Sequence, residues 1–157
     1  MTTPAPPYKI RPMVSGDHDF LSQVHEESFR EYIEKLWGWD ADWQREHFKV
    51  QLEDPDREHY VIEVQGESAG YLRLREEIDT LFVDNIQIKA ESQGLKIGTA
   101  IFQQLKQRAQ AENIDLCLRV FTINSRAFAF YKKLGFVEEK RDETHTVMRW
   151  SHNSSKT

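Results

Sequence analysis

Residues 86–99, IQIKAESQGLKIGT, decide the fold of this chain. Apolar residues alternate with polar ones up to Ile88, a polar loop containing Gly94 follows, and apolar residues at helical spacing begin at Ile97. The pattern predicts a strand, a loop and a helix in direct succession. The free main-chain N–H groups and the positive dipole end at the start of the helix then point at one spot. Such a spot binds a pyrophosphate.

A second segment, residues 124–136 with the sequence NSRAFAFYKKLGF, supports this interpretation. It follows an apolar run at residues 114–121 and predicts a short helix. Asn124 is expected to cap the start of this helix, and Gly135 its end.

The periodicity of the apolar residues predicts the remaining elements. Strands are expected at residues 8–12, 60–65, 69–75, 80–88, 115–121, 136–140 and 143–150, and helices at residues 20–36, 40–52, 97–110 and 124–134. The order β-α-α-β-β-β-α-β-α-β-β predicts an α/β fold with a mixed, mostly antiparallel sheet of about seven strands, flanked by about four helices.

The composition is that of an ordinary globular protein. Hydrophobic residues make up 39% and charged residues 30% of the 157 positions, which suits a single domain over residues 8–150. Residues 1–7 are rich in proline and residues 151–157 are polar, so both segments are expected to be flexible ends.

Several partners and environments are disfavoured. The net charge of −5 argues against a nucleic-acid binder, and no apolar run is long enough to span a membrane. Cys117 has no second cysteine with which to form an internal disulfide, and the N-terminus has no apolar secretion core. These features predict a cytoplasmic protein.

The two segments resemble the diagnostic motifs of the GNAT superfamily of acetyl-CoA-dependent N-acetyltransferases. The loop motif of that family, Gln/Arg-x-x-Gly-x-Gly/Ala, stands here at residues 93–98, with Lys96 in place of its first glycine. The second block of the family, an Asn followed by Phe-Tyr-x-x-Leu-Gly-Phe, appears as Asn124 and residues 130–136. The resemblance covers residues 8–150 and implies a GNAT-like fold.

The resemblance also implies acetyl-CoA as co-substrate, with no metal ion. The main chain of Ile86 and Ile88 would bond the pantetheine arm, and the Ile86 N–H would donate to the thioester oxygen. Asn124 would contact the cofactor as well as cap its helix. The pyrophosphate loop would comprise Gln93, Gly94, Leu95, Lys96, Ile97, Gly98 and Thr99.

Lys96 departs from the family pattern, and two interpretations stay open. A lysine gives up the freedom that glycine has if φ is positive at this position. Its ammonium group could offset that cost by pairing with a phosphate, or the side chain could simply point into water.

Tyr131 matches the tyrosine that lies near the thioester sulfur in this family, and is the expected catalytic acid. A phenol stays protonated at neutral pH and can donate to a thiolate. Phe82 stands where many relatives carry a glutamate, but other relatives have Glu-Asn or Glu-Asp two residues further on, where this chain has Asp84 and Asn85. The resemblance therefore implies Asp84 as the candidate base. Asp84 could equally hold a cationic acceptor by its charge, or be a solvated residue of the strand.

The acceptor pocket of the family lies at the first two helices and the loop between them. Here that region contains Tyr32, Trp37 and Trp39, which with Asp84 are the candidate acceptor-binding residues. The tryptophans could line an aromatic wall for the acceptor, or pack a helical corner onto the sheet.

The chain is therefore expected to be an N-acetyltransferase acting on a primary amine in a ternary complex. The acceptor would be a small molecule or a protein amine, and the carboxylates of Asp84, Asp40 and Glu34 slightly favour a small cationic amine. The alternatives are a non-catalytic acyl-CoA-binding module and a protein that assembles through the edge of its sheet. A homodimer is possible, because relatives often pair their C-terminal strands.

Overall fold

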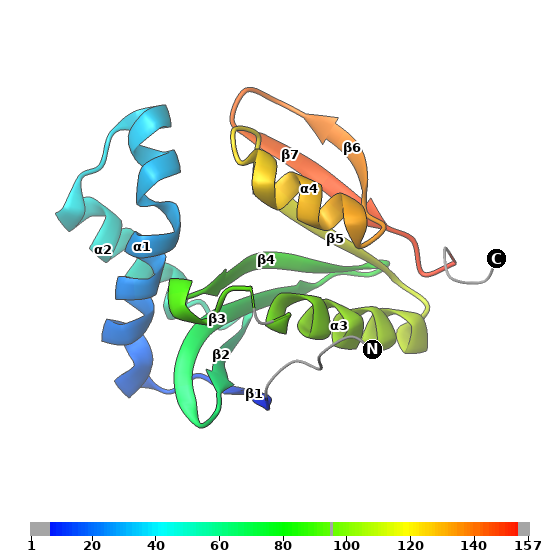
Figure 1. The fold of residues 1–157 in the computed structure, drawn as a ribbon, viewed down its shortest axis with the longest axis horizontal. Helices are drawn as coiled ribbons and strands as arrows, with labels where there is room; N and C mark the ends of the chain where they lie inside the picture. Colours follow the sequence, from blue (N-terminus) through cyan, green and yellow to red (C-terminus); the bar gives the residue numbers. More distant parts are fainter. Residues whose placement is uncertain (1–6, 95, 154–157) are drawn as a thin grey trace. The chain divides into compact units, whose positions relative to one another are not determined.

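The computed structural model describes residues 7–94 and 96–153. Within these residues the chain forms a seven-stranded sheet and four α-helices, so the expected α/β fold and element order are confirmed (Figure 1). The strands are hydrogen-bonded in the order β1-β2-β3-β4-β5-β7-β6. The elements are β1 (Tyr8–Pro12), α1 (His18–Trp37), α2 (Ala41–Leu52), β2 (Glu58–Val64), β3 (Glu67–Glu76), β4 (Thr80–Ile88), α3 (Ile97–Glu112), β5 (Asp115–Phe121), α4 (Ser125–Lys133), β6 (Val137–Arg141) and β7 (His145–Trp150).

The chain divides into two compact units. Among the described residues, the first unit comprises the chain up to Arg73 together with Asn85–Ile97, and the second comprises Leu74–Asp84 and the chain from Gly98 onward. The single domain over residues 8–150 stays a prediction. The expected flexible ends lie largely outside the described residues, although the His152 N–H donates to the Asp115 carboxylate.

The first unit is held by a core between its helices and strands. Leu21 from α1 and Phe48 from α2 pack with Val61 of β2 and Tyr71 of β3, each at most 1% exposed. β1 pairs antiparallel with β2. Burial of these side chains fixes which faces of α1 and α2 turn inward, at roughly 1.5–3 kcal/mol for each large apolar side chain.

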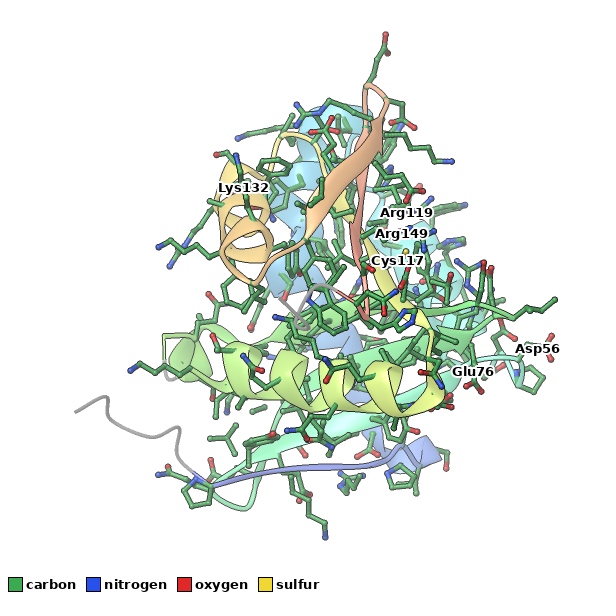
Figure 2. The ribbon with its side chains drawn as sticks, turned by 90° about the vertical axis from the view of Figure 1, so that its right-hand side faces the viewer. Asp56, Glu76, Cys117, Arg119, Lys132 and Arg149 are labelled. Carbon is green, nitrogen blue, oxygen red and sulfur yellow. The ribbon has the colours of Figure 1, made fainter. Side chains whose placement is uncertain are left out.

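The second unit joins parallel and antiparallel pairs. The first four residues of β4 pair parallel with β5, and β7 runs antiparallel to both β5 and β6. Phe102 of α3 is fully buried and meets the aromatic rings of the α4 region edge-on. Figure 2 shows Cys117 and Arg149 close together, in agreement with their pairing across β5 and β7.

No helix in the described part of the chain has both the length and the apolar character that crossing a membrane requires.

Candidate active site

The loop between β4 and α3 turns through left-handed backbone on both sides of Leu95. Gly94 has φ 80° and Lys96 has φ 64°, and α3 begins at the next residue, Ile97. A Cβ atom built on Gly94 would meet no atom of the described residues within 4 Å, so the loop is open there. Lys96 therefore adopts a left-handed conformation that glycine would adopt at less cost. Leu95 lies outside the described residues.

The start of this loop is tied to the end of β4. The Gln93 side-chain amide donates to the Ile88 carbonyl at 2.7 Å, and the Lys89 N–H donates to the Ala69 carbonyl at 2.8 Å. Gln93 thus has a side-chain contact that the sequence did not predict. Because a carbonyl oxygen has two lone pairs, the Ile88 carbonyl can still accept a second hydrogen bond.

Ile86 and Ile88 lie on β4 beyond its ladder with β5. That ladder joins Thr80–Val83 to residues 115–118 and ends three residues before Ile86. The side chains of Ile86 and Ile88 are half-buried, whereas Gln87 between them is only 2% exposed. The main chain of Gln87 also lies close to β3, because a Cβ atom on Gly70 would come within 2.2 Å of the Gln87 carbonyl oxygen.

Tyr131 lies in an aromatic cluster of the second unit. Its ring is 5.5 Å from that of Phe102 and 6.1 Å from that of Phe136, both at steep angles. Burial raises the pKa of the Tyr131 phenol to about 12, because the phenolate would be poorly solvated there. The phenol is therefore protonated throughout the neutral range.

Asn124 is the N-cap of α4, as expected. Its side-chain oxygen accepts from the Ala127 N–H at 3.1 Å. Gly98 and Thr99, the last two residues of the predicted pyrophosphate loop, lie in the first turn of α3 and are half-buried.

The carboxylate of Asp84 has a charged neighbour on the sheet. Its carboxylate lies 3.5 Å from the Arg75 guanidinium, whose carbon atom is 4.5 Å from the centroid of the Phe82 ring. Arg75 also contacts Glu77 at 3.1 Å. The face of the sheet at Asp84 therefore carries a cation and two carboxylates rather than one free negative charge.

A cavity of about 520 Å³ lies between α1 and α2. Trp39 and His25 line it, whereas Tyr32 and Trp37 are not among its lining residues. The Trp39 indole N–H is buried there without a hydrogen-bond partner among the described residues, and the Trp37 side chain is 61% exposed. The cavity also has three carboxylates in its lining: Asp19, Glu26 and Glu46.

The predicted residues are thus divided between the two units. The first unit contains the β4 main chain at Ile86 and Ile88, the loop up to Ile97, and the aromatic residues between α1 and α2. The second unit contains Asp84, Asn124 and Tyr131 with the first turn of α3.

Sequence reasoning missed three residues that the structure places beside the predicted ones: His25, Gln87 and Arg75. Gln87 interrupts the apolar side of β4 as a buried polar residue, and its amide lies 3.1 Å from the His25 ring. The signal for this pair was a glutamine between two isoleucines and a histidine next to Val24 on an apolar helix face. Nothing in the local pattern pointed to Arg75.

Other reactive groups offer no second site within the described chain. Cys117 is 2% exposed, and burial raises the pKa of its thiol to about 11, which makes it a poor nucleophile. No group of three or more potential metal ligands occurs in residues 7–94 and 96–153.

Comparison with known proteins adds a family and a set of relatives. Residues 20–136 match the acetyltransferase (GNAT) family. A Bacillus subtilis protein provisionally named ribosomal protein bS18-alanine N-acetyltransferase is 29% identical over 130 residues, covering 80% of this chain and 78% of that protein. An N-alpha-acetyltransferase of Sulfurisphaera tokodaii is 34% identical over 109 residues, covering 59% of this chain and 64% of that protein.

The fold has a counterpart among solved structures. The PaiA N-acetyltransferase of Thermoplasma acidophilum, crystallised in complex with coenzyme A, matches with a TM-score of 0.74 at 18% identity. The match covers 92% of this chain and 99% of that one.

Proposed function

The chain belongs to the acetyltransferase (GNAT) family, and from this premise we propose that it transfers the acetyl group of acetyl-CoA to a primary amine by direct attack in a ternary complex. The observation that carries the proposal is the loop before α3, whose main chain turns through positive φ at Gly94 and Lys96. Such turns aim successive N–H groups at one point, and the helix dipole adds to their attraction for a diphosphate. The coenzyme A complex of the PaiA relative supports the same co-substrate.

The pantetheine arm would lie along β4 at Ile86 and Ile88, beyond the end of the β4–β5 ladder at Val83. Their main-chain groups would form hydrogen bonds with the arm, as they would with a neighbouring strand. The Ile86 N–H would then donate to the carbonyl oxygen of the thioester. One donor aimed at the negative charge that develops on this oxygen lowers the barrier by roughly 3 kcal/mol.

In the reaction, the amine nitrogen attacks the acetyl carbon. A C–N bond forms, the C–S bond breaks, and coenzyme A leaves as a thiolate. The proton lost by the ammonium group of the acceptor passes to a base. The carboxylate of Asp84 pairs with Arg75 at 3.5 Å. We assign it the role of receiving the proton through a water molecule.

Tyr131 would stabilise the departing thiolate. With a pKa of about 12 for the phenol and about 8.5 for an ordinary thiol, full proton transfer to the sulfur is uphill by roughly 3 to 4 pK units. A hydrogen bond from the phenol to the thiolate is favourable without that transfer. Tyr131 therefore acts as a hydrogen-bond donor, and the thiol proton comes finally from solvent.

The acceptor class is the finer part of the proposal. The three carboxylates behind the expectation of a small cationic amine all have partners, since Asp84 pairs with Arg75, Asp40 caps α2, and Glu34 lies 4.0 Å from Arg30. The two relatives described above carry the names of α-amine acetyltransferases. We favour the α-amino group of a polypeptide as acceptor, with a small cationic amine as the competing candidate.

The test has two steps. Calorimetry with acetyl-CoA should show binding, and thiol release should then be followed with peptides bearing a free N-terminus, the same peptides with an acetylated N-terminus, and spermidine. The proposal expects fast release with the free N-terminus alone, and mass spectrometry should find the acetyl group on the α-nitrogen. Release with spermidine alone would assign the small cationic amine.

A protein that binds acetyl-CoA tightly while no amine accelerates thiol release would be a sensor or interaction module. Failure of the well-folded protein to bind acetyl-CoA would overturn the proposal altogether.

A further inference from the structure

His25 joins three elements of the first unit. From α1, its Nδ1 atom lies 3.1 Å from the Gln87 side-chain amide on β4. Its ring stacks on Phe48 of α2 at 4.2 Å and 11°, and it also hydrogen-bonds to the Gln44 side chain of α2.

The contacts fix the protonation state of His25. An amide nitrogen only donates, so the His25 Nδ1 must accept from Gln87 and the ring proton resides on Nε2. Burial lowers the pKa of His25 to about 4, and the charges of Arg73 on β3 and His47 on α2 act in the same direction. The imidazole is therefore neutral at physiological pH, and it has the one tautomer that can accept a hydrogen bond from the Gln87 amide at Nδ1.

Gln87 in turn is held on several sides. Its amide nitrogen also donates to the Asn85 side chain at 3.0 Å, and its main-chain carbonyl oxygen lies where a Cβ atom on Gly70 would reach within 2.2 Å. The side chain is 2% exposed. Movement of Gln87 would displace its two neighbours in the chain, Ile86 and Ile88.

We propose that His25 is a positioning residue, which fixes Gln87 and thereby the main chain of Ile86 and Ile88 in the geometry that binds the acyl-CoA arm. The inference rests on the proposed function, because that function gives the β4 main chain its role. His25 touches neither the cofactor nor the reacting atoms. It acts through the hydrogen bond from the Gln87 amide, which its Nδ1 atom can accept only while the imidazole is neutral.

The first experiment compares His25→Ala, Gln87→Leu and the double variant with wild type. Gln87→Leu removes a buried amide whose oxygen has no partner among the described residues, so it is the variant expected to fold best. His47→Ala is the matched control, because His47 also stacks on an aromatic ring of α2, Trp43 at 4.5 Å, and its bond to Gln51 stays on that helix. Amide hydrogen exchange at residues 86–88 in the coenzyme A complex and the Kd for coenzyme A are measured for each protein.

Both single variants should bind coenzyme A about five- to tenfold more weakly, and in their coenzyme A complexes the Ile86 and Ile88 amides should exchange about tenfold faster, as expected for loss of roughly 1–1.5 kcal/mol of one hydrogen bond. The double variant should be no worse than the singles, because both remove the same link. Folded variants with wild-type exchange and Kd, or with additive effects, would overturn the proposal. A lowered Tm without these changes would leave His25 a residue of the core only.

A second measurement uses Gln87→Glu. A carboxylate cannot donate to Nδ1, so the His25 ring should take up a proton, and its pKa followed by NMR should rise by about one unit or more. An unchanged His25 titration contradicts a direct link. If the wild-type protein itself fails to bind coenzyme A, the proposed function fails, while the His25 titration still decides whether His25 is linked to Gln87 on β4.

Discussion

In the proposed reaction, the single residue Tyr131 would set the chemistry available at the thioester. Its raised pKa, caused by burial among aromatic rings, keeps the phenol protonated. The phenol can therefore donate a hydrogen bond, but it does not readily transfer its proton. A hydrogen bond to a charged acceptor is worth about 1.5–3 kcal/mol, and this gain appears only as the thiolate forms.

Tyr131→Phe should therefore lower kcat about 10- to 100-fold and leave the Kd for acetyl-CoA nearly unchanged. Single-turnover kinetics and calorimetry measure the two quantities separately. Equal kcat values for the variant and the wild type would remove Tyr131 from the reaction.

Lys96 carries two opposing effects at one position. Its φ of 64° costs about 1 kcal/mol relative to glycine, and its ammonium group lies in the loop assigned to the diphosphate. The cost belongs to the backbone and the benefit to the charge, so two substitutions separate them.

Lys96→Gly should raise the free energy of unfolding by about 1 kcal/mol, whereas Lys96→Gln should leave it unchanged. Both should weaken coenzyme A binding about fivefold and flatten its dependence on salt, because both remove the charge. Urea unfolding and calorimetry at two salt concentrations measure these effects. If both variants bind coenzyme A as tightly as the wild type, the Lys96 side chain is solvated and does not contact the diphosphate.

At the scale of the elements, β3 and β4 depend on one glycine. A methyl group on Gly70 would come within 2.2 Å of the Gln87 carbonyl oxygen, and a backbone atom cannot swing away as the tip of a side chain can.

Gly70→Ala should therefore destabilise the protein by about 3 kcal/mol, at the upper end for overpacking, and loosen β4 next to Ile86. Urea unfolding measures the loss. Gly16→Ala is the control, because a Cβ atom at Gly16 would meet no atom of the described chain within 4 Å. Equal losses in the two variants would contradict the close approach.

Asn124 caps the start of α4, and in the proposed complex it would also contact coenzyme A. Serine can also cap a helix, but it lacks the amide with which Asn124 would contact coenzyme A.

Asn124→Ser should thus keep the stability within a few tenths of a kcal/mol and weaken coenzyme A binding, whereas Asn124→Ala should also lose about 1 kcal/mol. Thermal unfolding and calorimetry check the two effects. If the serine variant binds as tightly as wild type, Asn124 is a cap alone.

At the scale of the whole molecule, acid should weaken the fold through its histidines. The pKa of His25 is about 4 in the folded protein, against 6.5 for an ordinary histidine. Between pH 6.5 and 4, the unfolded chain therefore binds a proton at His25 that the folded chain does not bind. Burial lowers the pKa of His145 in the same direction. The contribution of these histidines to the free energy of unfolding is therefore fully present above pH 6.5 and is lost as the pH falls towards 4.

From His25 alone the loss is about 3 kcal/mol over this range. Urea unfolding at pH 7.0, 5.5 and 4.5 should reveal it, and His25→Asn, although less stable at pH 7, should lose less on acidification. Parallel pH dependence in the two proteins would show that His25 is not the group responsible. Below about pH 4, the ion-paired Asp17 and Asp115 add to the loss, because their pKa values are lowered in the folded protein.

The sequence by itself determined the secondary-structure elements, and it predicts the loop that is proposed to bind the cofactor. Alternation in residues 80–88, helical spacing from Ile97 and the cap at Asn124 are local features, and each residue acts on neighbours within one turn or one strand. The family followed from two motifs whose letters could be read directly. The sequence left open whether φ is positive at Lys96, and the structure gives it a φ of 64°.

Only the tertiary structure decided which polar groups meet. Gln87 and His25 are 62 residues apart, and the partner of Asp84 comes from the neighbouring strand. Such pairs depend on how β4 lies against α1 and β3, and no local periodicity records that packing. The physical reason is that a buried amide or carboxylate must find its partner wherever the fold brings one, whereas a strand or a helix is specified by its own residues.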